Sequence, residues 1–327
     1  MQQPAVRADA FDADLPPAIF LMGPTASGKT AVALELSEHL PVEIISVDSA
    51  QVYRHMNIGT AKPDQSTRLR HPHHLIDIID PTESYSAAQF RDDASQLMAD
   101  IAERGRIPLL VGGTMLYFKA LREGLSDLPS ADEAMRNVIE MMAQEAGWPA
   151  LHAELKRIDP QSAERIDVND VQRIQRALEV HYLTGKTMSE LIAESPRQNL
   201  PYRLIEVALL PSDRAKLHER IATRFEDMLE LGLLSEVREL REEFDVAADM
   251  PSMRCVGYRQ VWQYLEGEFG LAALREKAIA ATRQLAKRQL TWLRNMDDVL
   301  EFDCLLEDLP QRVHENLAEQ LAGGSRE

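Results

Sequence analysis

Short apolar runs alternate with longer amphipathic segments along most of this 327-residue chain. The runs are rich in β-branched residues and bounded by glycine, proline or polar residues, which is typical of buried strands. Between them, apolar residues recur at helical spacing, as Phe90, Ala94 and Met98 do within residues 86–104. This alternation predicts an α/β fold, a parallel sheet flanked by helices. The predicted strands are 18–22, 42–48, 73–79, 107–113 and 204–209.

The pattern changes over residues 125–197, where amphipathic helices follow one another without a convincing strand. One helix is predicted to begin at Asn169-Asp170, which are good N-cap residues, and to stop near Gly185. We therefore predict an all-helical insertion domain within the α/β core. The core comprises 16–124 and 198–315, including helices from Asp213, from about Val256 and over 271–293, and the predicted flexible tails are 1–15 and 316–327.

A glycine-rich loop follows the first predicted strand and opens onto a helical segment. Its sequence, GPTASGKT, matches the P-loop pattern G-x-x-x-x-G-K-[ST] at every position. Backbone N–H groups of such a loop and the following helix N-terminus bind phosphate. The alternative is a glycine-rich turn that merely joins a strand to a helix, but the flanking strand and helix together favour a phosphate site. We expect Lys29 to reach terminal phosphate oxygens and Thr30 to ligate Mg²⁺. The fold class is thus P-loop NTPase-like, and the predicted diphosphate-binding residues are Gly23, Pro24, Thr25, Ala26, Ser27, Gly28, Lys29 and Thr30.

Composition narrows the class of protein. The formal net charge is −17, which argues against a chain coated in basic residues but leaves a local nucleic-acid-binding patch open. The two cysteines form no C-x-x-C pair, so neither a disulfide framework nor a zinc site is indicated. No apolar run approaches the length of a membrane helix, and we expect a cytoplasmic protein with no membrane contact.

Three further features lie where chemistry is expected. Asp48 ends a predicted strand beside the P-loop, where it could hold magnesium, act as a general base or simply cap a turn. Gly112-Gly113 stands where many P-loop ATPases carry a metal-binding aspartate, and indicates either close approach of a ligand or backbone, or a plain tight turn. Arg220 and Arg224 share a helix face, which suits a phosphate clamp or a solvated surface.

Basic residues gather near the C-terminus of this acidic chain. Arg283, Lys287 and Arg294 fall on one face of a predicted helix, and RCVGYR at 254–259 precedes it. Such a stripe suits a nucleic-acid backbone, with Arg173 and Arg176 as a second basic element, although a salt-bridged helix has the same pattern.

Seven stretches taken together resemble the bacterial tRNA dimethylallyltransferases, also called tRNA isopentenyltransferases. They occur in the family's order and span nearly the whole chain: GPTASGKT at 23–30, DSAQVYR at 48–54, IGTAKP at 58–63, GGTMLYFKAL at 112–121, NDVQRIQRALEV at 169–180, RCVGYRQVW at 254–262 and QLAKRQLTWLR at 284–294. The combination is far more specific than the P-loop alone.

The resemblance implies transfer of a dimethylallyl group from dimethylallyl diphosphate to N6 of adenosine 37, in tRNAs that read codons beginning with U. It implies that Mg²⁺ is required, with the P-loop holding the isoprenoid diphosphate and Arg224 reaching it from the opposite side. Asp48 matches the family's general base, and Thr25 a threonine near the reacting carbon. Residues implied to contact the tRNA anticodon stem-loop are Asp48, Ser49, Ala50, Gln51, Thr114, Gln172, Arg173, Ile174, Gln175, Arg176, Arg254, Cys255, Val256, Gly257, Tyr258, Arg259, Lys287, Arg288, Gln289, Leu290, Thr291, Trp292, Leu293 and Arg294.

Three alternatives stay open at this point. A small-molecule P-loop kinase would bind ATP and would need neither the insertion nor the basic helix. An adenylate isopentenyltransferase would prenylate free AMP or ADP, and should lack both. A tRNA-binding regulator with a vestigial P-loop fits poorly with the intact Lys29, Thr30 and Asp48. The resemblance also implies a monomer.

Overall fold

A computed structural model describes residues 15–126, 128–194 and 200–323 of the chain. The chain divides into two compact units, one formed by 1–121 with 201–327 and the other by 122–200. The predicted insertion, 125–197, lies within the second unit. Each unit is described by itself below.

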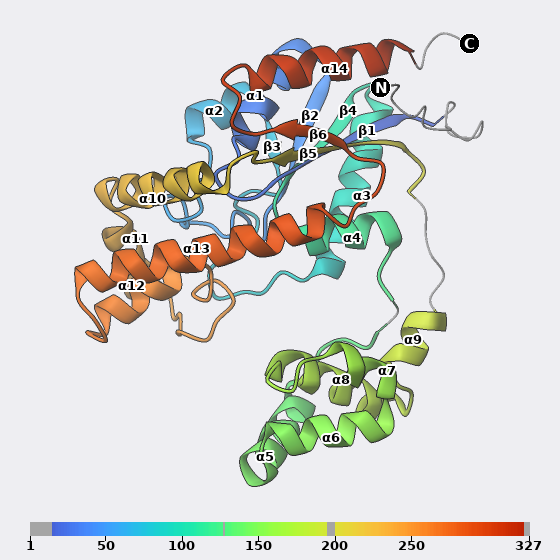
Figure 1. The fold of residues 1–327 in the computed structure, drawn as a ribbon, viewed down its shortest axis with the longest axis vertical. Coiled ribbons are helices and arrows are strands. Elements are labelled where there is room, and N and C mark those ends of the chain that lie inside the picture. The colour runs from blue at the N-terminus through green and yellow to red at the C-terminus, as the bar shows by residue number, and fades with distance from the viewer. Residues whose placement is uncertain (1–14, 127, 195–199, 324–327) are drawn as a thin grey trace. The chain divides into compact units, whose positions relative to one another are not determined.

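The larger unit is built on a six-stranded sheet in the order β3-β2-β4-β1-β5-β6 (Figure 1). Every neighbouring pair of strands is parallel, which confirms the predicted parallel α/β architecture. The strands are β1 (Pro17–Met22), β2 (Val42–Val47), β3 (His73–His74), β4 (Ile107–Gly112), β5 (Arg203–Leu210) and β6 (Leu300–Asp303).

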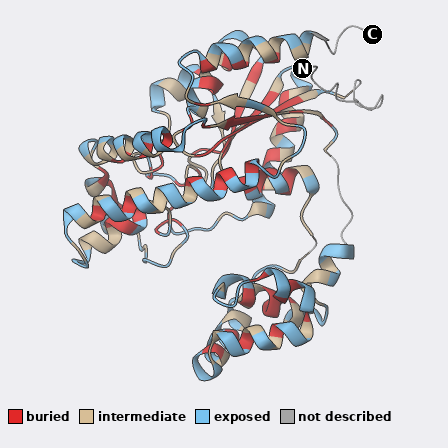
Figure 2. Cartoon of the chain, in the orientation of Figure 1, coloured by how far each residue is buried: buried red, intermediate tan, exposed pale blue. Residues whose placement is uncertain are grey.

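Helices cover both faces of this sheet, and the strands between them are largely buried (Figure 2). On one face α1 (Lys29–His39) and α14 (Leu309–Gly323) pack in a cluster that includes Ile19 and Leu21. Phe20 points the other way, and its ring lies 5.2 Å from that of Phe118. Both faces of β1 are therefore apolar, as expected for a central parallel strand.

A second apolar cluster joins the helices that follow β5 to the segment after β2. Its largest fully buried side chain is Tyr258, and Phe225, Val237 and Met56 pack with it. The remaining helices of this unit are α2 (Gln65–Arg70), α3 (Ala87–Glu103), α4 (Met115–Glu123), α10 (Arg214–Glu230), α11 (Leu233–Glu243), α12 (Tyr258–Leu265) and α13 (Leu271–Leu293).

The smaller unit contains only helices among its described residues, and Ile139, Leu155 and Ile174 lie in its core. Asp170 caps α8 by accepting a hydrogen bond from the N–H of Arg173, as the sequence predicted. The helices are α5 (Glu133–Ala146), α6 (Trp148–Ile158), α7 (Pro160–Arg165), α8 (Val171–Thr184) and α9 (Met188–Glu194).

Two predictions about elements of the larger unit were wrong. The strand predicted over 73–79 stops at His74, because Leu75 and Asp77 adopt positive φ angles of 60° and 58° that leave the extended conformation. The C-terminal tail was predicted to begin at 316, but residues 316–323 complete α14, and Leu317 is fully buried in the core. The predicted N-terminal tail, apart from residue 15, lies outside the described residues.

Candidate active site

The P-loop joins β1 to α1 and curls around its own lysine. Ala26 and Gly28 have φ angles of 64° and 83°, so the backbone turns through left-handed conformations that gather N–H groups into a nest. The Lys29 ammonium donates to the carbonyl oxygens of Gly23 and Pro24 at 2.8 and 2.7 Å. Ser27 Oγ is buried and has no hydrogen-bond partner among the described residues. A hydroxyl without a partner among the described residues, the N-terminus of α1 and a positive charge together fit a phosphate ligand.

Three charged side chains from separate elements converge beside this loop. Burial, and after it the neighbouring Arg224 guanidinium, lower the pKa of Lys29 to about 8, while the Asp48 carboxylate opposes this. Burial also lowers the pKa of Arg224, and Asp48 again acts in the opposite direction. Two half-buried cations, with Arg224 disfavouring the charge on Lys29, are expected where an anion is to be bound.

Asp48 has a structural role as well as a place in this charge cluster. Its Oδ1 accepts from the N–H groups of Ala50, at 2.8 Å, and Gln51, at 3.3 Å. The turn function that the sequence left open is therefore real, and it orients the carboxylate at the end of β2. Thr114 supports the same turn, since its Oγ1 accepts from the N–H of Ser49 at 3.1 Å.

The glycine pair after β4 is explained by backbone and side-chain approach within the protein. A Cβ at Gly112 would lie 2.0 Å from the carbonyl oxygen of Val47 on β2, and one at Gly113 would lie 2.3 Å from Nε2 of Gln289 on α13. Of the interpretations that the sequence allowed, close approach of other parts of the chain is therefore the one observed.

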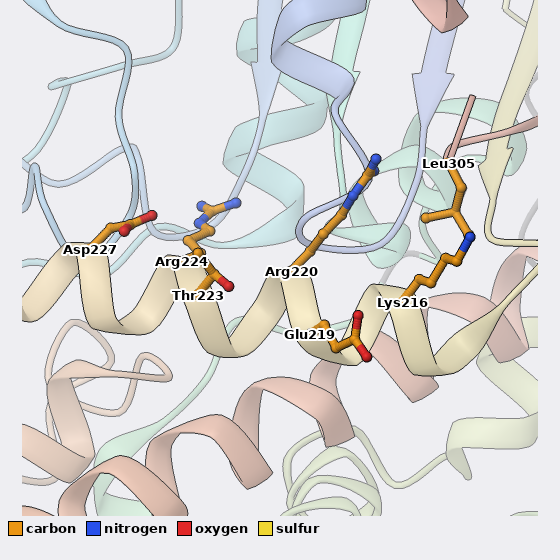
Figure 3. Close-up of a pocket in the computed structure, with 7 residues that line it drawn as sticks. All are labelled: Lys216, Glu219, Arg220, Thr223, Arg224, Asp227 and Leu305. Atoms are coloured by element: carbon orange, nitrogen blue, oxygen red, sulfur yellow. The ribbon is translucent and has the colours of Figure 1, made fainter. Parts of the chain in front are cut away.

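An open pocket of about 470 Å³ lies along α10 (Figure 3). Lys216, Arg220 and Arg224 follow one another at intervals of four residues and line it together. Arg220 donates to the carbonyl oxygen of Cys304 at 2.8 Å, so part of its guanidinium holds the end of β6. Arg224, which is half-buried, is the member of this row that interacts electrostatically with both Lys29 and Asp48.

Several of the residues predicted to contact tRNA in the larger unit are exposed. Burial, and after it the Asp48 carboxylate, raise the pKa of the half-buried Cys255 thiol to about 12, so the segment around Cys255 lies near Asp48. One face of Trp292 is covered by the ammonium of Lys119, 5.7 Å from the ring centroid. The exposed side chains of the predicted set in this unit are Ser49, Arg254, Arg259, Lys287, Arg288, Thr291, Trp292 and Arg294.

Five side chains predicted to contact tRNA are buried in the core, and for these the prediction is corrected to a packing or scaffold role. Tyr258 is fully buried and donates its hydroxyl hydrogen bond to Glu236. Their apolar or amide side chains lie on the inward faces of α8, α12 and α13, where helical periodicity directs them away from solvent. The five are Ile174, Tyr258, Gln289, Leu290 and Leu293.

In the smaller unit the two predicted arginines differ. Arg173 is 70% exposed, and its one ion-pair partner among the described residues is Asp170, which lies three residues before it. Arg176 donates to the fully buried Glu179 carboxylate at 2.7 Å and to the carbonyl oxygen of Pro129. Its guanidinium therefore satisfies a buried carboxylate, and Arg173 is the residue of the pair that is available to a ligand.

Two site residues carry roles that the sequence did not indicate. Glu236 is buried and accepts hydrogen bonds from three consecutive backbone N–H groups, those of residues 57–59. Gln289 bonds to the P-loop itself. No local pattern marks either residue, because their partners are distant in sequence; the glycine pair at 112–113 was the one available sign that something approaches there.

No group of three or more His, Cys, Asp or Glu side chains that could hold a metal ion occurs within the described ranges. A metal at this site would therefore depend on the exposed Thr30 hydroxyl, or on Asp48, together with oxygens of the bound phosphate. Nor does any described helix have the length and apolar character needed to cross a membrane.

Comparison with known proteins assigns the chain to a family. The profile described as IPP transferase matches residues 51–296, and that described as isopentenyl transferase matches residues 17–71. The chain is 61% identical to a tRNA dimethylallyltransferase of Nitrosomonas eutropha, over 92% of this chain and 95% of that protein. It is 63% identical to one of Nitrosospira multiformis, over 91% and 92%.

Solved structures agree with these relatives. The full-length tRNA isopentenylpyrophosphate transferase of Bacillus halodurans superposes with a TM-score of 0.69 at 38% identity, covering 95% of this chain and 98% of that one. A eukaryotic dimethylallyltransferase acting on tRNA superposes with a TM-score of 0.80 at 27% identity, covering 94% and 80%. The resemblance seen in the sequence is thereby confirmed, and this chain belongs to the IPP transferase family of prenyl-transferring enzymes.

Proposed function

We propose that this protein transfers a dimethylallyl group from dimethylallyl diphosphate to N6 of adenosine 37 in tRNAs that read codons beginning with U. The observation that carries the proposal is the convergence of Lys29, Arg224 and Asp48 at one P-loop. Two cations and a loop of N–H groups suit a diphosphate, and the carboxylate suits the proton of an attacking amine. The named relatives act on tRNA, which favours this substrate.

In the proposed reaction one set of protein groups acts on the diphosphate and another acts on the adenine amine. The P-loop N–H groups, Lys29 and Arg224 bind the diphosphate and stabilise the negative charge that grows on it as the allylic C–O bond breaks. The adenine amine is a poor nucleophile, because its lone pair is shared with the ring. Asp48 accepts a proton from N6 as the new C–N bond forms, and pyrophosphate leaves.

Prenyl transfer from a diphosphate typically uses a divalent metal ion, and we propose Mg²⁺ here. The Thr30 hydroxyl, the first turn of α1 and the Ser27 hydroxyl, which has no partner within the described ranges, fit a phosphate with its cation. When bound, Mg²⁺ supplies Lewis-acid neutralisation of the diphosphate charge.

The proposed RNA partner is the anticodon stem-loop. Single-stranded loop bases are read by splaying and stacking, and an enzyme that modifies a base takes it out of the stack. Exposed Arg254, Arg259, Lys287, Arg288 and Arg294 supply the positive charge that a phosphate backbone needs in an otherwise acidic chain. We propose that the protein acts as a monomer in the cytoplasm.

The test is a mass measurement on RNA. The protein is incubated with Mg²⁺, dimethylallyl diphosphate and an anticodon stem-loop carrying adenosines at positions 36 to 38. One added C5H8 unit is expected with the wild type, and none with Asp48→Ala or with guanosine at position 37. Prenylation of free AMP without reaction on RNA would place the protein among the adenylate isopentenyltransferases. No reaction on either substrate would overturn the proposal.

A further inference from the structure

We propose that Gln289 is a positioning residue for the diphosphate loop, and that its partner is this loop rather than RNA. The inference rests on the proposed function, because it assigns a role within that function's diphosphate site. Gln289 lies on α13 directly after the exposed Arg288 and is itself only 8% exposed.

The side-chain amide of Gln289 joins two strand ends. Its Oε1 accepts a hydrogen bond from the backbone N–H of Thr25 at 2.9 Å, and its Nε2 donates to the carbonyl oxygen of Gly113 at 2.9 Å. Thr25 belongs to the loop after β1, and Gly113 follows β4, the strand beside β1. A single buried group therefore connects α13, the P-loop and the neighbouring strand.

The chemistry of the two partners requires an amide at this position. The Thr25 N–H can only donate and the Gly113 carbonyl can only accept, so the group between them must offer one acceptor and one donor side by side. This requirement also fixes the orientation of the amide. A glutamate of the same shape would place two acceptors there, and a leucine would leave both backbone groups unsatisfied.

The Gln289 amide can approach the backbone at position 113 because Gly113 has no side chain. A Cβ at position 113 would lie 2.3 Å from Nε2 of Gln289 and 3.2 Å from the carbonyl oxygen of Gly23. Any side chain there would therefore push the amide out of place. The glycine after β4 therefore makes room for the glutamine on α13 that bonds to it, although 176 positions separate the two residues.

The consequence for the site is a fixed P-loop conformation. The N–H of Thr25 is directed to Gln289 and is thereby removed from the groups that can bind the diphosphate. The loop is held from α13 at the residue next to Pro24, whose carbonyl binds Lys29. Misplacement of a binding loop by about 1 Å can cost about 100-fold in rate, so loss of this support should be visible in the kinetics of the diphosphate substrate.

The exposed basic residues of α13 lie on the side of the helix opposite Gln289, so the role proposed for Gln289 is separate from RNA binding. Lys287, Arg288, Thr291 and Trp292 are exposed, whereas Ala286, Gln289 and Leu290 are buried. A substitution of Gln289 that retains the helix should therefore leave the exposed basic side chains in place, and with them the affinity for tRNA.

The experiment compares Gln289→Leu with Gln284→Leu, the same change at an exposed position of the same helix. We measure kcat and KM for dimethylallyl diphosphate, the dissociation constant of Mg²⁺-pyrophosphate by calorimetry, and that of tRNA by filter binding. All are measured well below the melting temperature of each variant. For Gln289→Leu we expect kcat/KM to fall about 10- to 100-fold, pyrophosphate affinity to fall with it, and tRNA affinity to change less than about twofold. Gln284→Leu should match the wild type.

A double-mutant cycle keeps the proposal testable if Gln289→Leu folds poorly. Gly113→Ala should lower kcat/KM in the wild type but add little in a Gln289→Ala background, since its severe clash, the one with the Gln289 amide, is then removed. Additive losses, or a loss of tRNA affinity with unchanged pyrophosphate binding, would overturn the proposal. Pyrophosphate binding is measured without RNA, so it tests Gln289 even if the wild type proved inactive on tRNA and the proposed function failed.

Discussion

The Tyr258 hydroxyl donates a hydrogen bond to the Glu236 carboxylate, with 2.5 Å between the two oxygens, and both side chains are buried. The same carboxylate accepts from the N–H groups of residues 57–59, at 2.7 to 3.1 Å. Burial, and after it the negative charge of Glu236, raise the pKa of Tyr258 well above its usual value. One carboxylate thus attaches the segment that follows the Asp48 turn to α11 and α12.

This relationship predicts unequal losses of stability. Glu236→Ala leaves four donors without their acceptor and should lower the free energy of unfolding by about 3 kcal/mol or more, whereas Tyr258→Phe removes one donor and should cost about 1 kcal/mol. Urea unfolding measures both losses in the free energy of unfolding. Tyr264→Phe, on the same helix and partly exposed, serves as the control and should be close to neutral. Equal losses for Glu236→Ala and Tyr258→Phe would contradict the shared-acceptor interpretation.

Asp48 can be tested so that its turn role and its chemical role separate. Asp48→Asn retains an oxygen acceptor for the N–H groups of Ala50 and Gln51 but cannot accept a proton, so kcat should fall by about 10²- to 10⁴-fold with the melting temperature nearly unchanged. Asp48→Ala should lower both kcat and the melting temperature. Asp64→Asn is the matched control, because Asp64 also accepts a backbone N–H, that of Thr67, but lies at the start of α2. A near-normal rate for Asp48→Asn would exclude Asp48 as the base.

The lowered pKa of Lys29 predicts how diphosphate binding depends on pH. In the free protein Lys29 loses its proton as the pH rises through about 8, while a bound anion favours the charged form and raises that pKa. Affinity for Mg²⁺-pyrophosphate should therefore be full below pH 8 and fall above it, by at most about tenfold per pH unit.

Lys29→Arg provides the comparison for this titration, because a guanidinium stays charged throughout the range. Ionisation of the ligand affects both proteins equally, so the ratio of their dissociation constants isolates Lys29. Calorimetry from pH 6 to pH 10 should show the ratio changing above about pH 8. A ratio that is constant with pH would mean that Lys29 keeps its ordinary pKa or does not contact the ligand.

The two arginines at the start of α8 should behave differently. Arg173→Ala should weaken tRNA binding and reduce the dependence of log affinity on log salt by about one, with no change in stability. Arg176→Ala leaves the buried Glu179 with Arg136 as its remaining guanidinium partner among the described residues, and should lower the free energy of unfolding by roughly 1–3 kcal/mol. Filter binding across a salt series and urea unfolding check both. A stability loss for Arg173→Ala, or none for Arg176→Ala, would reverse the assignment.

The sequence by itself determined the parts of this protein that depend on local signals. The strand–GPTASGKT–helix pattern predicted the P-loop, since its fixed glycines, lysine and threonine are the residues that the loop conformation and a phosphate ligand require. Apolar spacing predicted α13 over 271–293, and N-cap chemistry at Asp170 placed the start of α8. Strands alternating with helices were sufficient to predict a parallel sheet, because such connections leave few other arrangements.

Only the tertiary structure decided which side chain of a matching stretch faces inward. Gln289 and Lys287 lie in the same stretch, yet one bonds a loop 264 positions away and the other is exposed. Tyr258 on α12 is directed to Glu236 on α11 by packing between helices that no local pattern encodes. Arg176 and Glu179 have the local i,i+3 spacing of one helix, but only packing in the smaller unit buries Glu179 and so commits the guanidinium to it. Such pairings depend on the positions of whole elements, whereas periodicity reports only the face of a single one. The sequence therefore located the candidate site, and the fold separated the residues exposed at it from those that hold it in shape.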